Sequence, residues 1–211
     1  MASFLPHFGH NRLWRGQPDR EAGERVTPSV SPTAGAGERG PVVDERRVAA
    51  VLNDPGRLLA VYTTGLLDSG PEAHHDRVAR TAAAALAAPS AALTVVGADH
   101  QVLVGAVDAV PRSRRQSLDL FCQYVVANGA PIVVADARRD PLFASQASVR
   151  QGRITSYLGV PLTDHWGHAV GALFVYDPGP RMWGSGHVQI LGDLAEVAST
   201  RIFESTYEPH R

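Results

Sequence analysis

Two pairs of apolar segments, each divided by a four-residue polar turn, constrain the fold of this chain more than any other feature. The first pair spans residues 91–107 around the turn 97–100, and the second is "YLGVPLTDHWGHAVGALFVYD", residues 157–177, around 164–167. Runs rich in β-branched and aromatic residues around short turns predict β-hairpins. Pro161 indicates an edge or a bulge in its strand, since proline cannot donate to a ladder.

Amphipathic helices are predicted around these hairpins. The apolar patterns cover residues 43–52, a short helix opening at Pro55, residues 72–88, residues 113–128 and a last helix that Ser185 caps. "PIVVAD" is a further short strand, and a polar loop with a helical turn follows it. Because helices with one apolar face need a surface to cover, the predicted fold is α+β, a central antiparallel sheet of five or six strands with helices packed on it.

One domain is expected, over residues 42–205. Residues 1–41 are rich in Gly, Pro, Ser, Arg and Glu and are expected to form a disordered tail, and residues 206–211 a short C-terminal tail. The N-terminal segment lacks the continuous apolar core of a signal peptide, and no apolar run is long enough to span a bilayer. A cytoplasmic protein is therefore expected.

Composition excludes several classes of chemistry. The net charge of -1 gives no pull toward nucleic acid or an anionic membrane, so neither is expected as a partner. All 20 basic residues are arginine, which excludes a Schiff-base lysine and a phosphate-loop lysine. The single cysteine, Cys122, allows neither an internal disulfide nor a multi-thiolate zinc site, and it fits a reducing compartment.

Five segments of the chain resemble, in order and spacing, a known family. They are "GLLDSGPEAHHDRVAR", "LFCQYVVANGAPIVVADARRDPLF", "ITSYLGVPL", "GHAVGALFVYD" and "LGDLAEVAS", and together they make the region from about Leu58 to Glu204 similar to a GAF domain. The resemblance implies a twisted antiparallel sheet with helices on one face and a loop-closed pocket on the other. It also implies a small-molecule sensor or dimerising module of signalling proteins.

The same resemblance implies a set of pocket-lining residues. These candidates are Phe121, Cys122, Tyr124, Asp136, Phe143 and Tyr157. Many relatives carry serine and histidine where this chain has Leu120 and Tyr124, so no particular ligand is carried over, no cofactor is required, and neither haem nor bilin is expected. Alternatively, the aromatic members of this set fill the pocket themselves.

Cys122 is the candidate nucleophile. One branch of the family reduces free methionine sulfoxide, but it resolves the oxidised cysteine with further cysteines, so this chain would need an outside thiol. A cysteine in mid-helix on an apolar face packs as a small hydrophobe, and we expect that role for Cys122.

Arginines gather in the loops expected to rim the pocket. Residues 111–153 hold seven arginines and three aspartates, a local balance of +4. Because the planar guanidinium suits carboxylates and phosphates, an anionic ligand or acidic partner is one hypothesis, and solvated loop charges are the other. The rim candidates are Arg138, Arg139, Arg150 and Arg153.

The histidines predict no metal site. His165 and His168 lie in a turn with too few donors near them for zinc, and His74 and His75 are expected as exposed helix positions.

These observations favour a non-enzymatic small-molecule sensor or regulatory module that acts in trans on a partner protein. The alternatives are a redox enzyme that uses Cys122 on a small oxidised metabolite, and a ligand-free dimerisation scaffold. The apolar stripe of the last helix, together with residues 43–52, is expected to form a homodimer face, unless both helices only cover the sheet.

Overall fold

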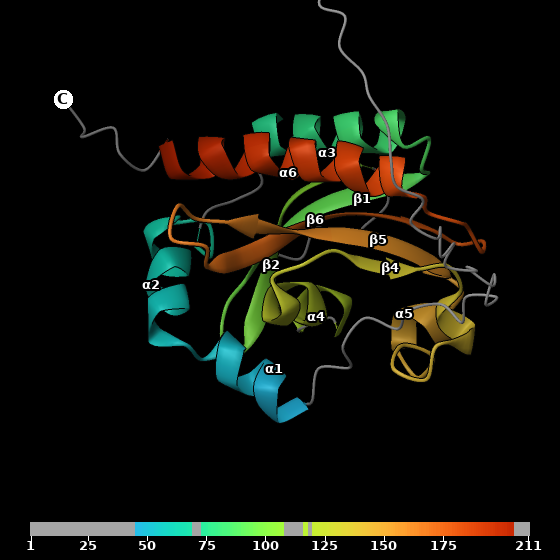
Figure 1. Cartoon of the computed structure of the whole chain (residues 1–211), viewed down its shortest axis with the longest axis horizontal. Helices are drawn as coiled ribbons and strands as arrows, with labels where there is room; N and C mark the ends of the chain where they lie inside the picture. The colour runs from blue at the N-terminus through green and yellow to red at the C-terminus, as the bar shows by residue number, and fades with distance from the viewer. Residues whose placement is uncertain (1–44, 69–72, 108–115, 118–119, 205–211) are drawn as a thin grey trace, which may run out of the picture. The chain divides into compact units, whose positions relative to one another are not determined.

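Six strands form one antiparallel sheet in the computed structural model, which describes residues 45–68, 73–107, 116–117 and 120–204 (Figure 1). The strand order is β3-β2-β1-β6-β5-β4, so the two predicted hairpins, β1–β2 and β5–β6, join through the central pair β1–β6. The α+β prediction is confirmed. The strands are β1 Ser90–Val96, β2 His100–Val107, β3 Gln116–Ser117, β4 Ile132–Val134, β5 Ser156–Thr163 and β6 Ala169–Asp177.

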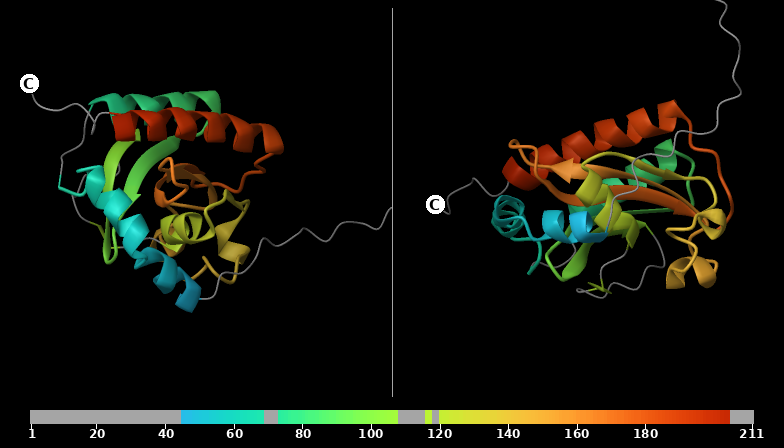
Figure 2. Two further views of the ribbon diagram at one scale, coloured as in Figure 1. Left: turned by 60° about the vertical axis from the view of Figure 1, so that its left-hand side comes forward. Right: turned by 60° about the horizontal axis from the view of Figure 1, so that its bottom comes forward.

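Helices cover both faces of this sheet (Figures 1 and 2). Helices α3 and α6 lie side by side on one face, and α4, with α1 packed against it, lies on the other. The second face therefore carries a helical layer of its own at the place where the resemblance implied a loop-closed pocket. The helices are α1 Glu45–Leu52, α2 Pro55–Thr63, α3 Ala73–Ala85, α4 Leu120–Asn128, α5 Ala147–Arg150 and α6 Ser185–Glu204, with a 3-10 turn η1 at Ala137–Arg139.

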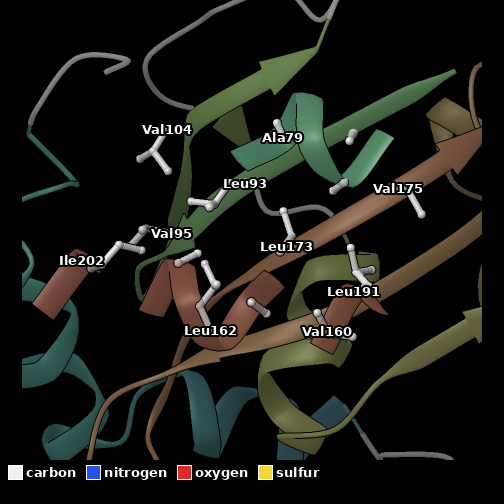
Figure 3. Packing of buried hydrophobic residues seen from close by; sticks show 14 of the residues in the cluster. Ala79, Leu93, Val95, Val104, Val160, Leu162, Leu173, Val175, Leu191 and Ile202 are labelled. Carbon is white, nitrogen blue, oxygen red and sulfur yellow. The ribbon is translucent and has the colours of Figure 1, made fainter. Parts of the chain in front are cut away.

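The period of two along each strand divides the apolar residues into two cores. Leu93, Val95 and Leu173 of the central strands pack under α3 and α6, where Leu191 and Ile202 meet them (Figure 3). The opposite side chains of the same strands, such as Ala92 and Phe174, pack against α4 and α1.

Among the described residues, no strand pairs with the outer edge of β5 along its second half, which is therefore called its open edge. Strand β4 pairs only with residues 157–159 of β5, and the β5–β6 ladder shifts register between Leu162 and Thr163. Pro161 lies within this stretch, where its missing N–H costs no bond to a further strand. The Thr163 N–H donates to Ser199 Oγ of α6 at 3.1 Å. The edge predicted from Pro161 is confirmed, and these features protect it against strand addition.

Two helix boundaries differ from the prediction. Helix α4 begins at Leu120 instead of residue 113, because residues 116–117 pair with β2 as strand β3. Helix α3 ends at Ala85, before Pro89, because Ala87 adopts a left-handed φ of +48°. The Ala88 N–H then donates to the Ala83 carbonyl at 2.9 Å, which closes a Schellman motif.

Arg181 completes this helix end. Its guanidinium donates to the carbonyls of Leu86 and Ala87, and it lies 4.4 Å over the ring of Trp183. A cation at a helix C-terminus also complements the helix dipole. Arg181 thereby ties α3 to the segment that leads into α6.

The remaining organisational predictions lie largely outside the described part of the chain. The predicted tails, residues 1–41 and 206–211, fall outside the described residues, which lie within the predicted domain 42–205. Within the described residues, no helix is both long and apolar enough to cross a membrane.

Candidate functional site

Aromatic rings form a stacked column between α4 and the sheet. The Phe121 ring of α4 lies 4.2 Å from that of Phe143 and 4.6 Å from that of Tyr157, centroid to centroid, at interplanar angles of 8° and 25°. Tyr157 continues to Phe174 of β6 at 5.4 Å, and Tyr124 meets Phe143 edge-on at 5.9 Å. Phe121, Tyr157, Phe143 and Tyr124 are at most 4% exposed. Four predicted pocket residues therefore pack on one another.

Gly159 makes the position of Tyr157 in this column possible. Both residues project from the same face of β5, and a Cβ at Gly159 would lie 2.7 Å from the Tyr157 ring carbons. Any larger residue at 159 would force the ring out of the stack. The glycine in "YLGVPL" therefore has a packing reason.

Cys122 lies beside the column, 2% exposed. Its Sγ is 3.9 Å from the Tyr157 hydroxyl, a contact in which either atom can donate. This burial agrees with the expected packing role, but the expected mid-helix position is wrong, because α4 begins at Leu120 and Cys122 lies in its first turn. A reactive thiol needs access and a neighbouring cation or base.

Asp136 lies at the rim, where its carboxylate is bound by neighbouring arginines. Arg138 donates to it in a bidentate arrangement, Nε to Oδ1 and Nη2 to Oδ2, both at 2.8 Å, and Arg139 Nε lies 3.7 Å from Oδ2. The hydrogen bond from Arg138 holds the pKa of the Asp136 carboxyl below its usual range. Asp136 also accepts the Arg138 N–H as the N-cap of η1. The pair fixes the loop after β4.

The other arginines of the rim stand in solvent. Arg139 has a side chain that is 88% exposed, and Arg150 and Arg153 are exposed. Burial raises the pKa of Tyr176, against the opposing effects of its hydrogen bond with Ser90 and of the nearby Arg153. Arg139, Arg150 and Arg153 remain rim candidates, whereas Arg138 is committed to Asp136.

One of the predictions about histidines agrees with the structure and another does not. His168 Nδ1 lies 2.9 Å from Asp164 Oδ2 in the β5–β6 turn, as part of that turn's own hydrogen bonding. His75, expected as exposed, is only 3% exposed, so that expectation is wrong. The reason is a close approach to β2: a Cβ at Gly105 would lie 2.5 Å from the His75 carbonyl carbon. Among the described residues, no group of three or more metal-ligating side chains occurs.

A cleft of about 910 Å³ lies away from the column, between the open edge of β5 and the C-terminal half of α6. Pro161, Glu196, Phe203 and Glu204 are among its lining residues. None of the six predicted pocket residues lines it.

Phe174 is the member of the column that the sequence analysis missed. It faces Gly159 across the β5–β6 ladder, so the space that the glycine leaves lies opposite this ring. The alternation along β6 could have predicted this position. Phe174 lies on the same face of the strand as Ala172 and on the opposite face from Leu173.

The part of the chain that forms the column belongs to a region that matches a known domain family. The family model described as GAF domain matches residues 71–202. A comparison of the sequence with curated proteins finds no match.

Solved structures with this fold include proteins of several kinds. The GAF domain of a phosphoenolpyruvate-protein phosphotransferase from Coxiella burnetii is 17% identical with a TM-score of 0.55, over 72% of this chain and 96% of that one. The PixJ GAF domain of Thermosynechococcus elongatus is 16% identical (TM-score 0.53; 74% and 92%). Free methionine-R-sulfoxide reductase from Neisseria meningitidis is 19% identical (TM-score 0.52; 80% and 95%). Such likeness shows the fold alone.

Proposed function

Because the chain belongs to the GAF domain family, we propose that it is a non-enzymatic regulatory module that acts in trans on a partner protein. In this proposal the resting form is ligand-free, and the family's pocket is filled by the chain's own aromatic rings. Regulation then works through the surfaces of the domain.

The observation that carries the proposal is the stacked column. Phe143, Phe121, Tyr157 and Phe174 lie with successive ring centroids 4.2, 4.6 and 5.4 Å apart, so each ring packs directly against the next, and buried aromatic pairs of this kind are stabilising. A ligand at the predicted pocket positions would have to displace a ring that is already buried. Displacement of that kind is unfavourable unless the ligand replaces the lost contacts.

The non-enzymatic part of the proposal is supported by the surroundings of Cys122. Its thiol is buried, and its sulfur contact with Tyr157 is to a phenol, which is a weaker activating group than a cation. The reductases among the structural neighbours share the fold, but at 14% and 19% sequence identity this likeness is no evidence for their activity in this chain.

Native mass spectrometry of the protein purified from its own cells tests the ligand-free form. The expected mass is that of the polypeptide, or of a multiple of it, before and after denaturation. A small molecule that is released only on denaturation would overturn the ligand-free form and favour a small-molecule sensor.

An assay with free methionine sulfoxide and an external thiol reductant tests the absence of enzyme activity. No turnover is expected. Turnover that disappears in a Cys122→Ser variant, with unchanged far-UV circular dichroism, would assign the protein to the redox-enzyme alternative.

A further inference from the structure

The cleft beside α6 is a candidate binding site that the aromatic column does not explain. Its volume of about 910 Å³ lies within the range of ligand-binding clefts. One wall is the open edge of β5 around Pro161 and Thr163, and the other is the second half of α6, which packs along β5 (Figure 1). None of the column's rings is among the lining residues.

The strand wall of this cleft does not offer its main chain for pairing. Pro161 has no N–H, and the N–H of Thr163 donates to Ser199 Oγ at 3.1 Å. Addition of a further strand requires a row of available donors and acceptors. Recognition in the cleft must therefore come mainly from side chains.

The helix wall presents carboxylates at a regular spacing. Glu196, Thr200 and Glu204 line the cleft four residues apart, so they follow one line of the helix at steps of about 6 Å along its axis. All three are exposed, and the Thr200 hydroxyl donates to the Glu196 carbonyl at 3.0 Å within the helix. Phe203, which is half-buried, also lines the cleft. The wall therefore presents an acidic, a less polar and again an acidic position.

This spacing matches that of an extended polypeptide. Side chains on one face of an extended chain recur every second residue, at about 6.6–6.8 Å. A segment that lies along α6 thus places alternate side chains opposite Glu196, Thr200 and Glu204. The complementary segment carries a basic residue, an apolar residue two positions later and a second basic residue after two more. Among the described residues that line the cleft, none is an arginine that would compete for the two carboxylates.

We propose that the cleft binds an extended basic segment of a partner protein. Two cationic side chains of the segment pair with Glu196 and Glu204, and the apolar side chain between them packs on Thr200 and Phe203. The inference rests on the proposed function, in which the module regulates a partner through its surfaces, and it names the chemistry of that partner.

An exposed tryptophan extends the apolar surface beside the cleft. Trp166 is 76% exposed, and its ring centroid lies 4.6 Å from that of His165, which lines the cleft. Tryptophan is a frequent anchor of protein interfaces, and a large exposed ring next to a cleft is typical of a docking surface. A partner segment longer than the cleft can therefore continue onto Trp166.

The homodimer face predicted from the last helix and residues 43–52 is a different surface. Val48 and Leu52 are buried in the core on the opposite face of the sheet from α6, so residues 43–52 cannot share a face with that helix. Val197, an exposed apolar residue of α6, does not line the cleft. The cleft is therefore separate from that prediction.

Nuclear magnetic resonance of the nitrogen-15-labelled full chain, titrated with a synthetic peptide, tests this site. The probe is a seven-residue peptide with arginine at its second and sixth positions, valine at the fourth and serine elsewhere. Amide signals of residues 162–165 and 192–204 should shift. Glu196→Arg should raise the dissociation constant at least about tenfold, because an attractive pair becomes repulsive. The double variant Glu196→Arg/Glu204→Arg should instead bind the same peptide with glutamate in place of arginine.

Asp193→Arg is the matched control. It makes the same change in charge at an exposed position of the same helix, outside the cleft, where the carboxylate accepts a hydrogen bond from Gln189 at 2.8 Å. Its dissociation constant should change little at physiological salt, and circular dichroism confirms that each variant folds. A peptide with its two arginines adjacent should bind more weakly, because the two side chains then point to opposite faces.

Several results would overturn the site. They are the absence of binding to the wild-type protein, shifts confined to other residues, equal binding of the two arginine peptides, and an equal loss of binding in the control. Shifts of the cleft signals with protein concentration, in the absence of peptide, would assign the cleft to a second copy of the chain and would also overturn it. The mass of the purified protein tests the ligand-free form separately, so either proposal can fail without the other.

Discussion

Arg57 joins three separate segments through one buried side chain. Arg57 is only 2% exposed. Its guanidinium donates to the carbonyls of Leu52, Val96 and Ala169 at 2.5, 2.8 and 3.4 Å. It also donates to the carbonyls of Val51 and Gly97. The end of α1, the end of β1 and the start of β6 are thereby held together. Burial lowers the pKa of Arg57 to about 10, against the effect of the nearby Asp54, so the group stays charged at neutral pH.

Substitution of Arg57 should therefore cost far more than substitution of an ordinary arginine. Arg57→Met removes every donor from these buried carbonyls, and we expect a loss of about 3 kcal/mol in the free energy of unfolding. Arg57→Lys should lose less, because an ammonium can reach some of the same acceptors. Urea unfolding measures both. A methionine variant within about 0.5 kcal/mol of the wild type, the usual range for surface changes, would contradict this role.

No local pattern in the sequence predicts this role of Arg57. An arginine in a short helix pattern is expected in solvent, because arginine is rarely fully buried unless paired. The acceptors that bury it come from segments far apart in the sequence, and no local pattern links them. The start of this helix, in contrast, follows from the sequence. Pro55 indicated the first helical position, and Asp54 just before it is the N-cap, whose side chain accepts the Arg57 N–H at 2.8 Å.

At the scale of elements, the β5–β6 turn is organised by one carboxylate. Asp164 Oδ1 accepts the N–H groups of Trp166 and His168 at 2.9 and 2.8 Å, and Oδ2 contacts the His168 ring. Gly167 supplies the left-handed φ of +87° that the return requires. The turn and its strands were predicted from the sequence, whereas this role of Asp164 follows only from the positions of the donors around it.

Asp164 makes the stability of this hairpin depend on pH. Burial acts to raise the pKa of Asp164, but the hydrogen bonds from His168 and Trp166 outweigh it, and the pKa lies below its usual value. A carboxyl group with a lowered pKa in the folded state stabilises above the unfolded pKa of about 3.9, and this contribution is lost as the pH falls through the folded pKa.

We expect the Asp164→Asn variant to be less stable than the wild type by about 1 kcal/mol at neutral pH, since the charge-assisted bonds are weakened. The difference between the two proteins should shrink below a pH of about 4. Urea unfolding at a series of pH values gives both curves. Parallel curves down to the acid transition would exclude this contribution of Asp164.

At the scale of the whole molecule, the sequence predicts the layers better than the site. Strand alternation and helix periodicity follow from local spacing, and they led to the antiparallel sheet and to the faces of α3 and α6. The stacking of Phe143 on Phe121 depends on how the loop after β4 returns to α4, and no period in the sequence encodes that return. The resemblance therefore named Phe121, Tyr124, Phe143 and Tyr157, but only the structure shows that their rings contact one another.

The column should be a structural unit whose outer ring can be replaced. Phe143→Ala should lower the free energy of unfolding by about 3–4 kcal/mol, because it leaves an apolar cavity beside Phe121. A dry apolar cavity of this kind binds small aromatic molecules. Indole should therefore raise the melting temperature of Phe143→Ala and leave that of the wild-type protein unchanged, as measured by circular dichroism.

Val149→Ala is the matched control for this experiment, because Val149 is 3% exposed and lies in the same core without belonging to the ring stack. It should be destabilised by only about 1 kcal/mol and should not respond to indole, because its cavity is too small for a ring. If indole stabilised the wild-type protein as much as the Phe143→Ala variant, the pocket would admit a ligand without the loss of Phe143. The chain's own rings would then not be what fills it, and the ligand-free form of the module would have to be abandoned.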